Sequence, residues 1–109
     1  MKKKIDEIAR KLSTALKETF DDFEGLYLYG SQVRGDATKD SDIDIVALVG
    51  NVDKDRAKRR SVLGLISRFV YDYYNYDIDI DFHPMTRQEL EHNYYFYDEV
   101  VNKGVFYGA

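Results

Sequence analysis

The sequence predicts one domain of the α+β (α/β) class over residues 1–109, with a small three-stranded mixed sheet and helices packed on one face. Three observations predict it. Apolar residues recur at spacings of three and four in 3–20 and again in the helix that follows residue 53. Residues 43–49 form a nearly continuous apolar run. Residues 76–83 alternate strictly between apolar and polar side chains. The expected order is α-β-turn-β-α-β-α.

Residues 3–75 are expected to form two helices and two strands. A short β-type run at 26–29 stops at Gly30, and the polar residues 31–41 should form a turn or a short helical segment. Asp53 is a suitable N-cap for the second helix, which Asn75 should end. The apolar stripe of the first helix comprises Ile5, Ile8, Leu12, Ala15, Leu16 and Phe20, and that of the second comprises Val62, Leu65, Ile66, Phe69, Val70 and Tyr73.

One strand and one helix are expected in the C-terminal third of the chain. Thr86 and Glu89 match a capping box that opens the last helix, and Gly104 is a suitable stop for it. Tyr94, Tyr95, Phe96 and Tyr97 are expected to pack this helix on the sheet. The alternative is an exposed aromatic surface for a second protein.

Composition excludes several function classes. The chain has no cysteine, so a disulfide framework, a thiolate zinc site and a cysteine nucleophile are ruled out. The N-terminus lacks the apolar segment of a signal peptide, and no run is long enough to span a membrane, so a cytoplasmic protein is expected. A formal net charge of −4 argues against direct nucleic-acid binding through bulk charge. The basic run 54–60 is expected to form a solvated helix surface, with a binding patch for RNA or a partner as the alternative. His83 and His92 are expected to be incidental.

Two aspartates give the first chemical signal. Asp42 and Asp44 are two positions apart on a strand, so both side chains point to one face, about 7 Å apart along the backbone. Ionised carboxylates in that arrangement repel unless a cation lies between them. Carboxylate oxygens are hard ligands, so Mg²⁺ or Mn²⁺ is expected here rather than zinc. A third carboxylate from the acidic face of 76–83 would complete a site for two divalent ions.

The turn before this strand gives the second signal. Gly30 allows a phosphate to approach the backbone, and the Ser31 hydroxyl can donate to the same group. Arg34 lies one turn further on and is a candidate ligand for a triphosphate oxygen, although it can instead pair with Asp36 or Asp40. Anion-binding backbone beside an acidic strand suits a nucleoside triphosphate bound with its magnesium.

The string Gly-Ser, ten residues, Asp-x-Asp resembles the pattern of DNA polymerase β-like nucleotidyltransferases. Residues 28–35 and 41–45 resemble the minimal nucleotidyltransferase (MNT) family in particular. The resemblance implies the nucleotidyltransferase fold, with Gly30 and Ser31 binding the triphosphate and Asp42 and Asp44 holding two magnesium ions. It also implies a third aspartate, about five residues before the residue that opens the last helix. Counting back from Thr86 favours Asp81, with Asp79 as the alternative.

The implied reaction is transfer of a nucleoside monophosphate, by family analogy AMP from ATP, to an acceptor hydroxyl. The chain is expected to lack an acceptor-binding domain, so a homodimer or a separate protein should present the acceptor. By resemblance, that partner is a HEPN-type toxin, modified on a tyrosine by this chain as antitoxin. Two alternatives remain: a binding module that neutralises its partner by contact alone, and a nucleotidyltransferase acting on a small molecule of the aminoglycoside type.

Overall fold

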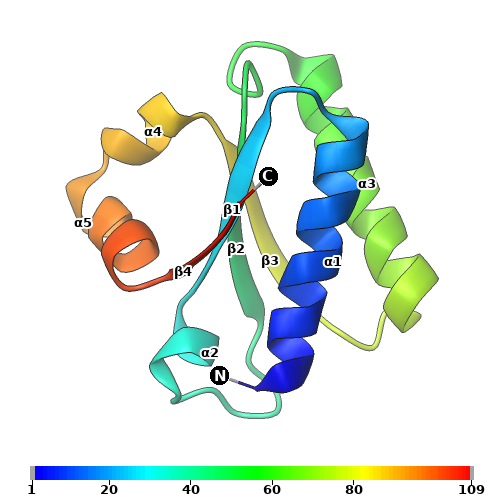
Figure 1. Cartoon of the computed structure of the whole chain (residues 1–109), viewed down its shortest axis with the longest axis vertical. Helices are drawn as coiled ribbons and strands as arrows, with labels where there is room; N and C mark the ends of the chain where they lie inside the picture. Colours follow the sequence, from blue (N-terminus) through cyan, green and yellow to red (C-terminus); the bar gives the residue numbers. More distant parts are fainter. Residues whose placement is uncertain (1, 109) are drawn as a thin grey trace.

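The computed structural model describes residues 2–108. Figure 1 shows a sheet that lies between two groups of helices. In chain order the elements are α1 (Lys3–Thr19), β1 (Phe23–Tyr29), α2 (Ser31–Arg34), β2 (Ile43–Val49), α3 (Arg56–Tyr74), β3 (Ile80–Met85), α4 (Arg87–Glu91), α5 (Tyr94–Tyr97), the π-helical turn η1 (Asp98–Asn102) and β4 (Val105–Gly108). Among the described residues, no helix is both long and apolar enough to cross a bilayer.

The sheet is mixed, as expected, but it has four strands rather than three. The strand order is β3-β2-β1-β4, with β1 antiparallel to both neighbours and β2 parallel to β3. The additional strand, β4, follows Gly104, where the sequence suggested only a helix stop. A side chain at Gly104 would collide with the carbonyl oxygens of Val100 and Leu28, so glycine lets η1 lie close against β1 before the chain enters β4.

Helices cover both faces of the sheet, so the expectation of one covered face was wrong. One face packs against α1 and α3, and the other against α4, α5 and η1 (Figure 1). Strand β2 shows why, because its side chains alternate between two cores. Ile43, Ile45, Ala47 and Val49 belong to the first core, whereas Val46 and Leu48 belong to the second with Tyr29, Leu90 and Val100.

The two long helices form nearly as predicted. In α3 the buried residues are Val62, Ile66, Phe69 and Val70, whereas Tyr73 is 60% exposed, so its assignment to the buried stripe was wrong. The N-cap is Asp55, not Asp53. The amides of Lys54 and Asp55 donate to the Asn51 carbonyl, so Asp53 lies within a turn. The Asp55 carboxylate then accepts from the Lys58 amide at 3.1 Å.

The third strand begins later than the alternation suggested, at Ile80 instead of residue 76. Asn75 ends α3 as predicted, but both Asn75 and Tyr76 have positive φ angles, 48° and 61°. The chain therefore turns before it enters the sheet. Pro84 is accommodated in β3 because this strand forms an edge, where a missing N–H costs no ladder bond.

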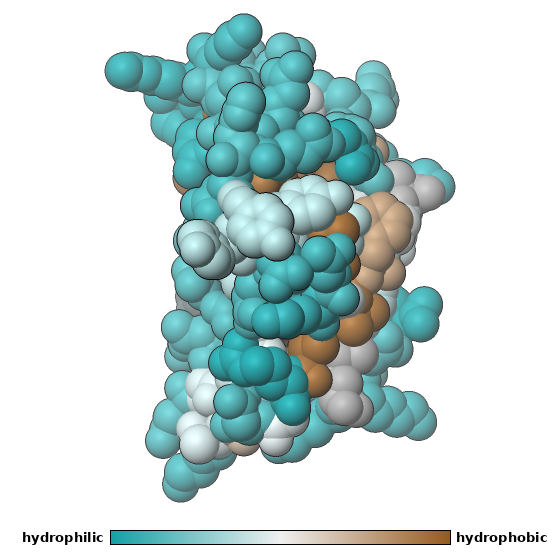
Figure 2. Space-filling view, turned by 90° about the vertical axis from the view of Figure 1, so that its left-hand side faces the viewer, coloured by the Kyte–Doolittle hydropathy of each residue, from teal (hydrophilic) through white to brown (hydrophobic). Residues whose placement is uncertain are grey.

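The last predicted helix is broken into α4, α5 and η1. The capping box forms as expected, with reciprocal hydrogen bonds between Thr86 and Glu89. The break follows from Asn93, whose side chain caps a new helix by accepting from the Phe96 amide. Phe96 and Tyr97 pack on the second core, but Tyr94 and Tyr95 are 77% and 85% exposed, so their expected packing was wrong. Figure 2, drawn from the α4–α5 side, shows a largely hydrophilic face with a hydrophobic strip.

Candidate active site

The parallel pairing of β2 and β3 brings two of the candidate carboxylates together. Asp44 and Asp81 are Cα partners in the register of this pair, which places their backbones about 4.8 Å apart. Both residues are two positions before a residue that faces or borders the second core, Val46 and His83. The two carboxyl groups therefore lie on the face covered by α5 and η1.

Asp42 and Asp79 lie just outside the strands. Asp42 is exposed and precedes β2, and its negative charge acts on Asp44. Asp79 contributes its backbone carbonyl, which accepts from the Ile43 amide at 2.9 Å, and its side chain is exposed. Of the two candidates for the third carboxylate, Asp81 is thus the one in register with Asp44.

The electrostatics of Asp44 reflect this crowding of like charges. Burial raises the pKa of the Asp44 carboxyl above its usual range, and the charge of Asp81, hydrogen bonding to Asp81 and the charge of Asp42 raise it further. His83 acts weakly in the opposite sense. Over the described range 2–108, no positive charge near Asp44 offsets the effects of burial and of the neighbouring carboxylates on its pKa.

The turn at Gly30 lies directly against Asp44. Gly30 has φ 81°, and a Cβ built there would overlap with the Oδ2 atom of Asp44. The amides of Val33 and Arg34 both donate to the Gly30 carbonyl, at 3.1 and 3.0 Å, and this forms the single turn α2 with Ser31 at its start. Gly35, with φ 87°, ends it. The backbone at Gly30, the first turn of α2 and the Asp44 carboxylate therefore lie close together.

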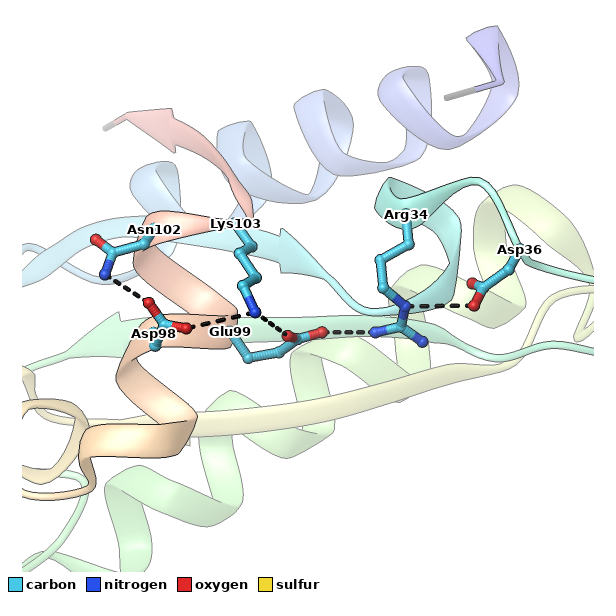
Figure 3. Close-up of polar contacts among 6 residues, drawn as sticks. All are labelled: Arg34, Asp36, Asp98, Glu99, Asn102 and Lys103. Atoms are coloured by element: carbon cyan, nitrogen blue, oxygen red, sulfur yellow. Dashed lines mark hydrogen bonds and ion pairs between the residues drawn. The ribbon is translucent and has the colours of Figure 1, made fainter.

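Arg34 forms ion pairs with two carboxylates. Its Nη1 lies 2.5 Å from Glu99 Oε1, and its Nε lies 3.4 Å from Asp36 Oδ2. Figure 3 shows the guanidinium between these partners, extended from α2 toward η1. Pairing with Asp36 was the predicted alternative to phosphate binding, whereas Glu99, 65 positions away, had no signal in the sequence.

Three further residues border the carboxylates. His83 Nε2 lies 3.2 Å from Asp81 Oδ1, and the Phe96 ring meets both His83 and Tyr29 edge-on. Burial, followed by the charges of Asp44, Asp81 and Glu99, raises the pKa of the Tyr29 phenol far above its usual value. The sequence suggested that His83 is incidental, yet its position two residues after Asp81 places it beside that carboxylate, because alternate strand residues share a face.

The donor set fits a hard divalent cation. Asp44 and Asp81 offer only oxygen ligands. The Asp44 pKa is raised first by burial and then by the charges of Asp81 and Asp42, and a cation would relieve that repulsion. Within residues 2–108, no three acidic, histidine or cysteine side chains converge as a complete metal site on their own. Any ion bound here would therefore draw further ligands from water or from a phosphate.

A family model described as a nucleotidyltransferase domain matches residues 9–105. This chain belongs to the nucleotidyltransferase domain family. The match spans all the strands except most of β4, and it includes the Gly30-Ser31 turn and the carboxylates. The superfamily and the enzyme class indicated by the Gly-Ser-x10-Asp-x-Asp string are thereby confirmed.

Three known proteins are similar to this nucleotidyltransferase. A Methanocaldococcus jannaschii protein with the provisional name protein adenylyltransferase is 32% identical over 101 residues, which cover 93% of this chain and 92% of that protein. A crystal structure provisionally assigned as a nucleotidyltransferase from Sulfolobus solfataricus matches with TM-score 0.64 and 22% identity, covering 94% of this chain and 78% of that one. A toxin–antitoxin crystal structure with AMP-PNP matches with TM-score 0.60 and 23% identity, covering 91% and 71%. The two structural matches show that the fold is shared.

Proposed function

We propose that this nucleotidyltransferase transfers AMP from ATP to a hydroxyl group on a protein, using two Mg²⁺ ions held by Asp42, Asp44 and Asp81. The observation that carries the proposal is the register of Asp44 with Asp81 beside the Gly30-Ser31 turn. Two adjoining strands thus supply the carboxylates, and the preceding turn supplies the phosphate contact. Bound divalent ions would stabilise negative charge on the triphosphate and lower the pKa of the attacking hydroxyl.

Four residues of this chain have separate roles in binding the nucleotide and in the reaction. Gly30 permits the triphosphate to approach the backbone because it carries no side chain, and Ser31 donates its hydroxyl to a phosphate oxygen. Arg34 neutralises polyphosphate charge. Asp81 is assigned to the activation of the acceptor hydroxyl. The acceptor hydroxyl gives its proton to Asp81, and its oxygen bonds to the α-phosphorus as the bond from that phosphorus to the bridging oxygen breaks. Pyrophosphate leaves with the charge that Ser31 and Arg34 help to hold.

A protein acceptor is favoured over a small molecule by the relatives. The M. jannaschii relative is named for the adenylylation of protein, and a structural neighbour is a toxin–antitoxin complex with AMP-PNP. We therefore propose that the acceptor is a tyrosine of a HEPN-type toxin and that this chain is the antitoxin. The rival function is neutralisation by contact alone, which requires no transfer.

The test is intact-mass spectrometry of the partner protein encoded beside this chain, after incubation with this protein, Mg²⁺ and each nucleoside triphosphate in turn. The expected result is a mass gain of one adenylyl group with ATP, which is lost when EDTA is added. The doubly substituted variant Asp42→Asn/Asp44→Asn should fold and produce no gain. If that variant neutralises the partner as fully as the unsubstituted protein does, contact alone is the function and the transfer proposal fails.

A further inference from the structure

Glu99 joins the last helical segment of the chain to the turn that begins at Gly30. Its carboxylate binds a different cation through each oxygen. Oε1 accepts from Arg34 Nη1 at 2.5 Å, and Oε2 lies 4.0 Å from Lys103 Nζ. Figure 3 shows Glu99 in the middle of a continuous row of polar contacts that runs from Asp36 to Asn102. Glu99 is therefore the link between η1 and α2.

The element that carries Glu99 is well anchored. Val100 is fully buried in the second core, and the amide of Gly104 donates to its carbonyl at 3.1 Å. Lys103 also pairs with Asp98 at 3.4 Å. π-Helical turns are rare and occur frequently at functional sites. An anchored π-turn can present a carboxylate in a fixed direction, which a loop would do less well.

Glu99 shares one neighbour with the acidic pair, the Tyr29 phenol. Its charge acts on the Tyr29 phenol together with the charges of Asp44 and Asp81. Arg34 carries five N–H donors on three nitrogens, and its carboxylate partners engage Nη1 and Nε. Within the described part of the chain, Nη2 has no hydrogen-bond partner, so the guanidinium keeps donors for a further anion while two carboxylates restrain its plane.

We propose that Glu99 is a positioning residue for nucleotide binding, which holds the Arg34 guanidinium ready for the polyphosphate of ATP. The inference rests on the proposed function. A purely stabilising role is the weaker explanation, because ion pairs whose side chains are 49% and 31% exposed contribute little to folding. Arginine has many rotamers, and restraining them before the ligand arrives reduces the entropy lost on binding.

The test compares the dissociation constants of Mg-ATP and AMP by calorimetry for the full chain and for Glu99→Gln. We expect Mg-ATP to bind about 3- to 10-fold more weakly to Glu99→Gln, because Arg34 must then be ordered by the ligand itself. AMP, which lacks the β- and γ-phosphates, should bind with nearly unchanged affinity. A structural defect would weaken the binding of both ligands. A selective loss of affinity for Mg-ATP therefore distinguishes a positioning role of Glu99 from a structural one.

The matched control is Glu24→Gln. It removes another arginine–glutamate pair of comparable exposure, between Arg87 Nε and Glu24 Oε1 at 3.1 Å, from the far end of β1. Its affinity for Mg-ATP should equal that of the unsubstituted protein. In an Arg34→Gln background, Glu99→Gln should cause no further loss, because the two residues act as a unit.

Three results would overturn the inference: unchanged or tighter Mg-ATP binding to Glu99→Gln, an equal loss for AMP, or additive losses in the double variant. The outcome also separates this inference from the proposed function. If the unsubstituted protein binds Mg-ATP and Glu99→Gln binds it equally well, only the role of Glu99 is wrong. If the unsubstituted protein binds no Mg-ATP, the proposed function fails and the role of Glu99 fails with it.

Discussion

Gly30 is in direct contact with Asp44, so that a Cβ at position 30 would occupy the space of the Asp44 carboxylate oxygen Oδ2. The φ angle of 81° at Gly30 adds a second reason for glycine at this position. The contact ties the turn after β1 to the acidic end of β2. Because Tyr29, the last residue of β1, pairs with Asp44 in the sheet, a displacement of the turn is expected to move the Asp44 carboxylate.

The substitution Gly30→Ala should abolish Mg-ATP binding. Alanine displaces the Asp44 carboxylate as well as straining the backbone. The strain alone costs about 1–3 kcal/mol of stability, because Gly30, with φ 81° and ψ −152°, has a conformation that is almost exclusive to glycine. Gly35→Ala is the matched control, because Gly35 also has a positive φ, 87°, but a Cβ there meets no atom within 4 Å. The Gly35 variant should lose about 1–2 kcal/mol of stability, from its left-handed backbone alone, and keep its affinity. Calorimetry measures the affinity of each variant for Mg-ATP, and thermal unfolding measures its stability. Equal affinities of the two variants for Mg-ATP would contradict a role of the Gly30–Asp44 contact in nucleotide binding.

The pairing of Asp44 with Asp81 predicts which aspartate in 77–81 is essential. Asp81→Asn should reduce transfer by about 100-fold or more, because it removes one carboxylate from the pair that faces Gly30. Asp79→Asn should stay within about threefold of the unsubstituted rate, since Asp79 contributes its backbone carbonyl to the structure. The measurement is the rate of pyrophosphate release with the acceptor present. A larger loss of rate in Asp79→Asn than in Asp81→Asn would identify Asp79 as the third carboxylate.

The pKa of Asp44 predicts an unusual dependence of stability on pH. The native pKa is raised above its ordinary value of 3.8 by burial and by the charges of Asp81 and Asp42, so the native state binds this proton more tightly than the unfolded state does. Stability from this group is therefore lost as pH rises from 3.8 through the native pKa. In EDTA at pH 7, Asp44→Asn should unfold at a higher temperature than the unsubstituted protein.

The difference in melting temperature between these two proteins should shrink as the pH is lowered below 3.8, where Asp44 becomes protonated in both states. At pH 7, Mg-ATP should raise the melting temperature of the unsubstituted protein above that of Asp44→Asn. A ligand that binds only the native state stabilises it, and the variant lacks a carboxylate of the proposed site. Melting curves at several pH values test this. A lower melting temperature for Asp44→Asn than for the unsubstituted protein in EDTA at pH 7 would contradict the assigned electrostatics.

Tyr74 offers a test of the packing between α1 and α3. Its hydroxyl is buried and has no hydrogen-bond partner among residues 2–108. Removing such a hydroxyl relieves a desolvation cost, so Tyr74→Phe should raise the free energy of unfolding by about 1 kcal/mol. Tyr73→Phe is the control, because Tyr73 is 60% exposed and should change stability by less than about 0.5 kcal/mol. Urea denaturation of both variants would show the difference, and destabilisation by Tyr74→Phe would be the contrary result.

The Gly30 turn and strand β2 could be predicted because the residues that indicate them are close together in the sequence. Strand β2 has the expected bounds, and the turn at Gly30 precedes it as expected. The choice of Asp81 over Asp79 depended on a count from the capping residue Thr86, and the β2–β3 register places Asp81 opposite Asp44. The shift in the start of β3 did not disturb this count, because the capping box marks the end of the segment rather than its beginning.

The parts that could not be predicted depend on contacts between distant segments. Strand β4 has only four residues, too few for alternation to be visible, and it forms because β1 offers a free edge. The helices on the second face are an exception, because the unbroken apolar run 45–49 indicates burial of β2 on both sides. The pairing of Glu99 with Arg34 joins residues 65 positions apart and leaves no periodic trace in the sequence.

The most direct test of the central claim is a crystal structure with Mn²⁺ and AMP-PNP, in which anomalous scattering locates the metal. The account predicts anomalous peaks in contact with the carboxylates of Asp42, Asp44 and Asp81, with the phosphates of AMP-PNP against Gly30 and Ser31. Peaks at Asp79 or at another surface, or a nucleotide bound without metal at Asp44, would contradict it.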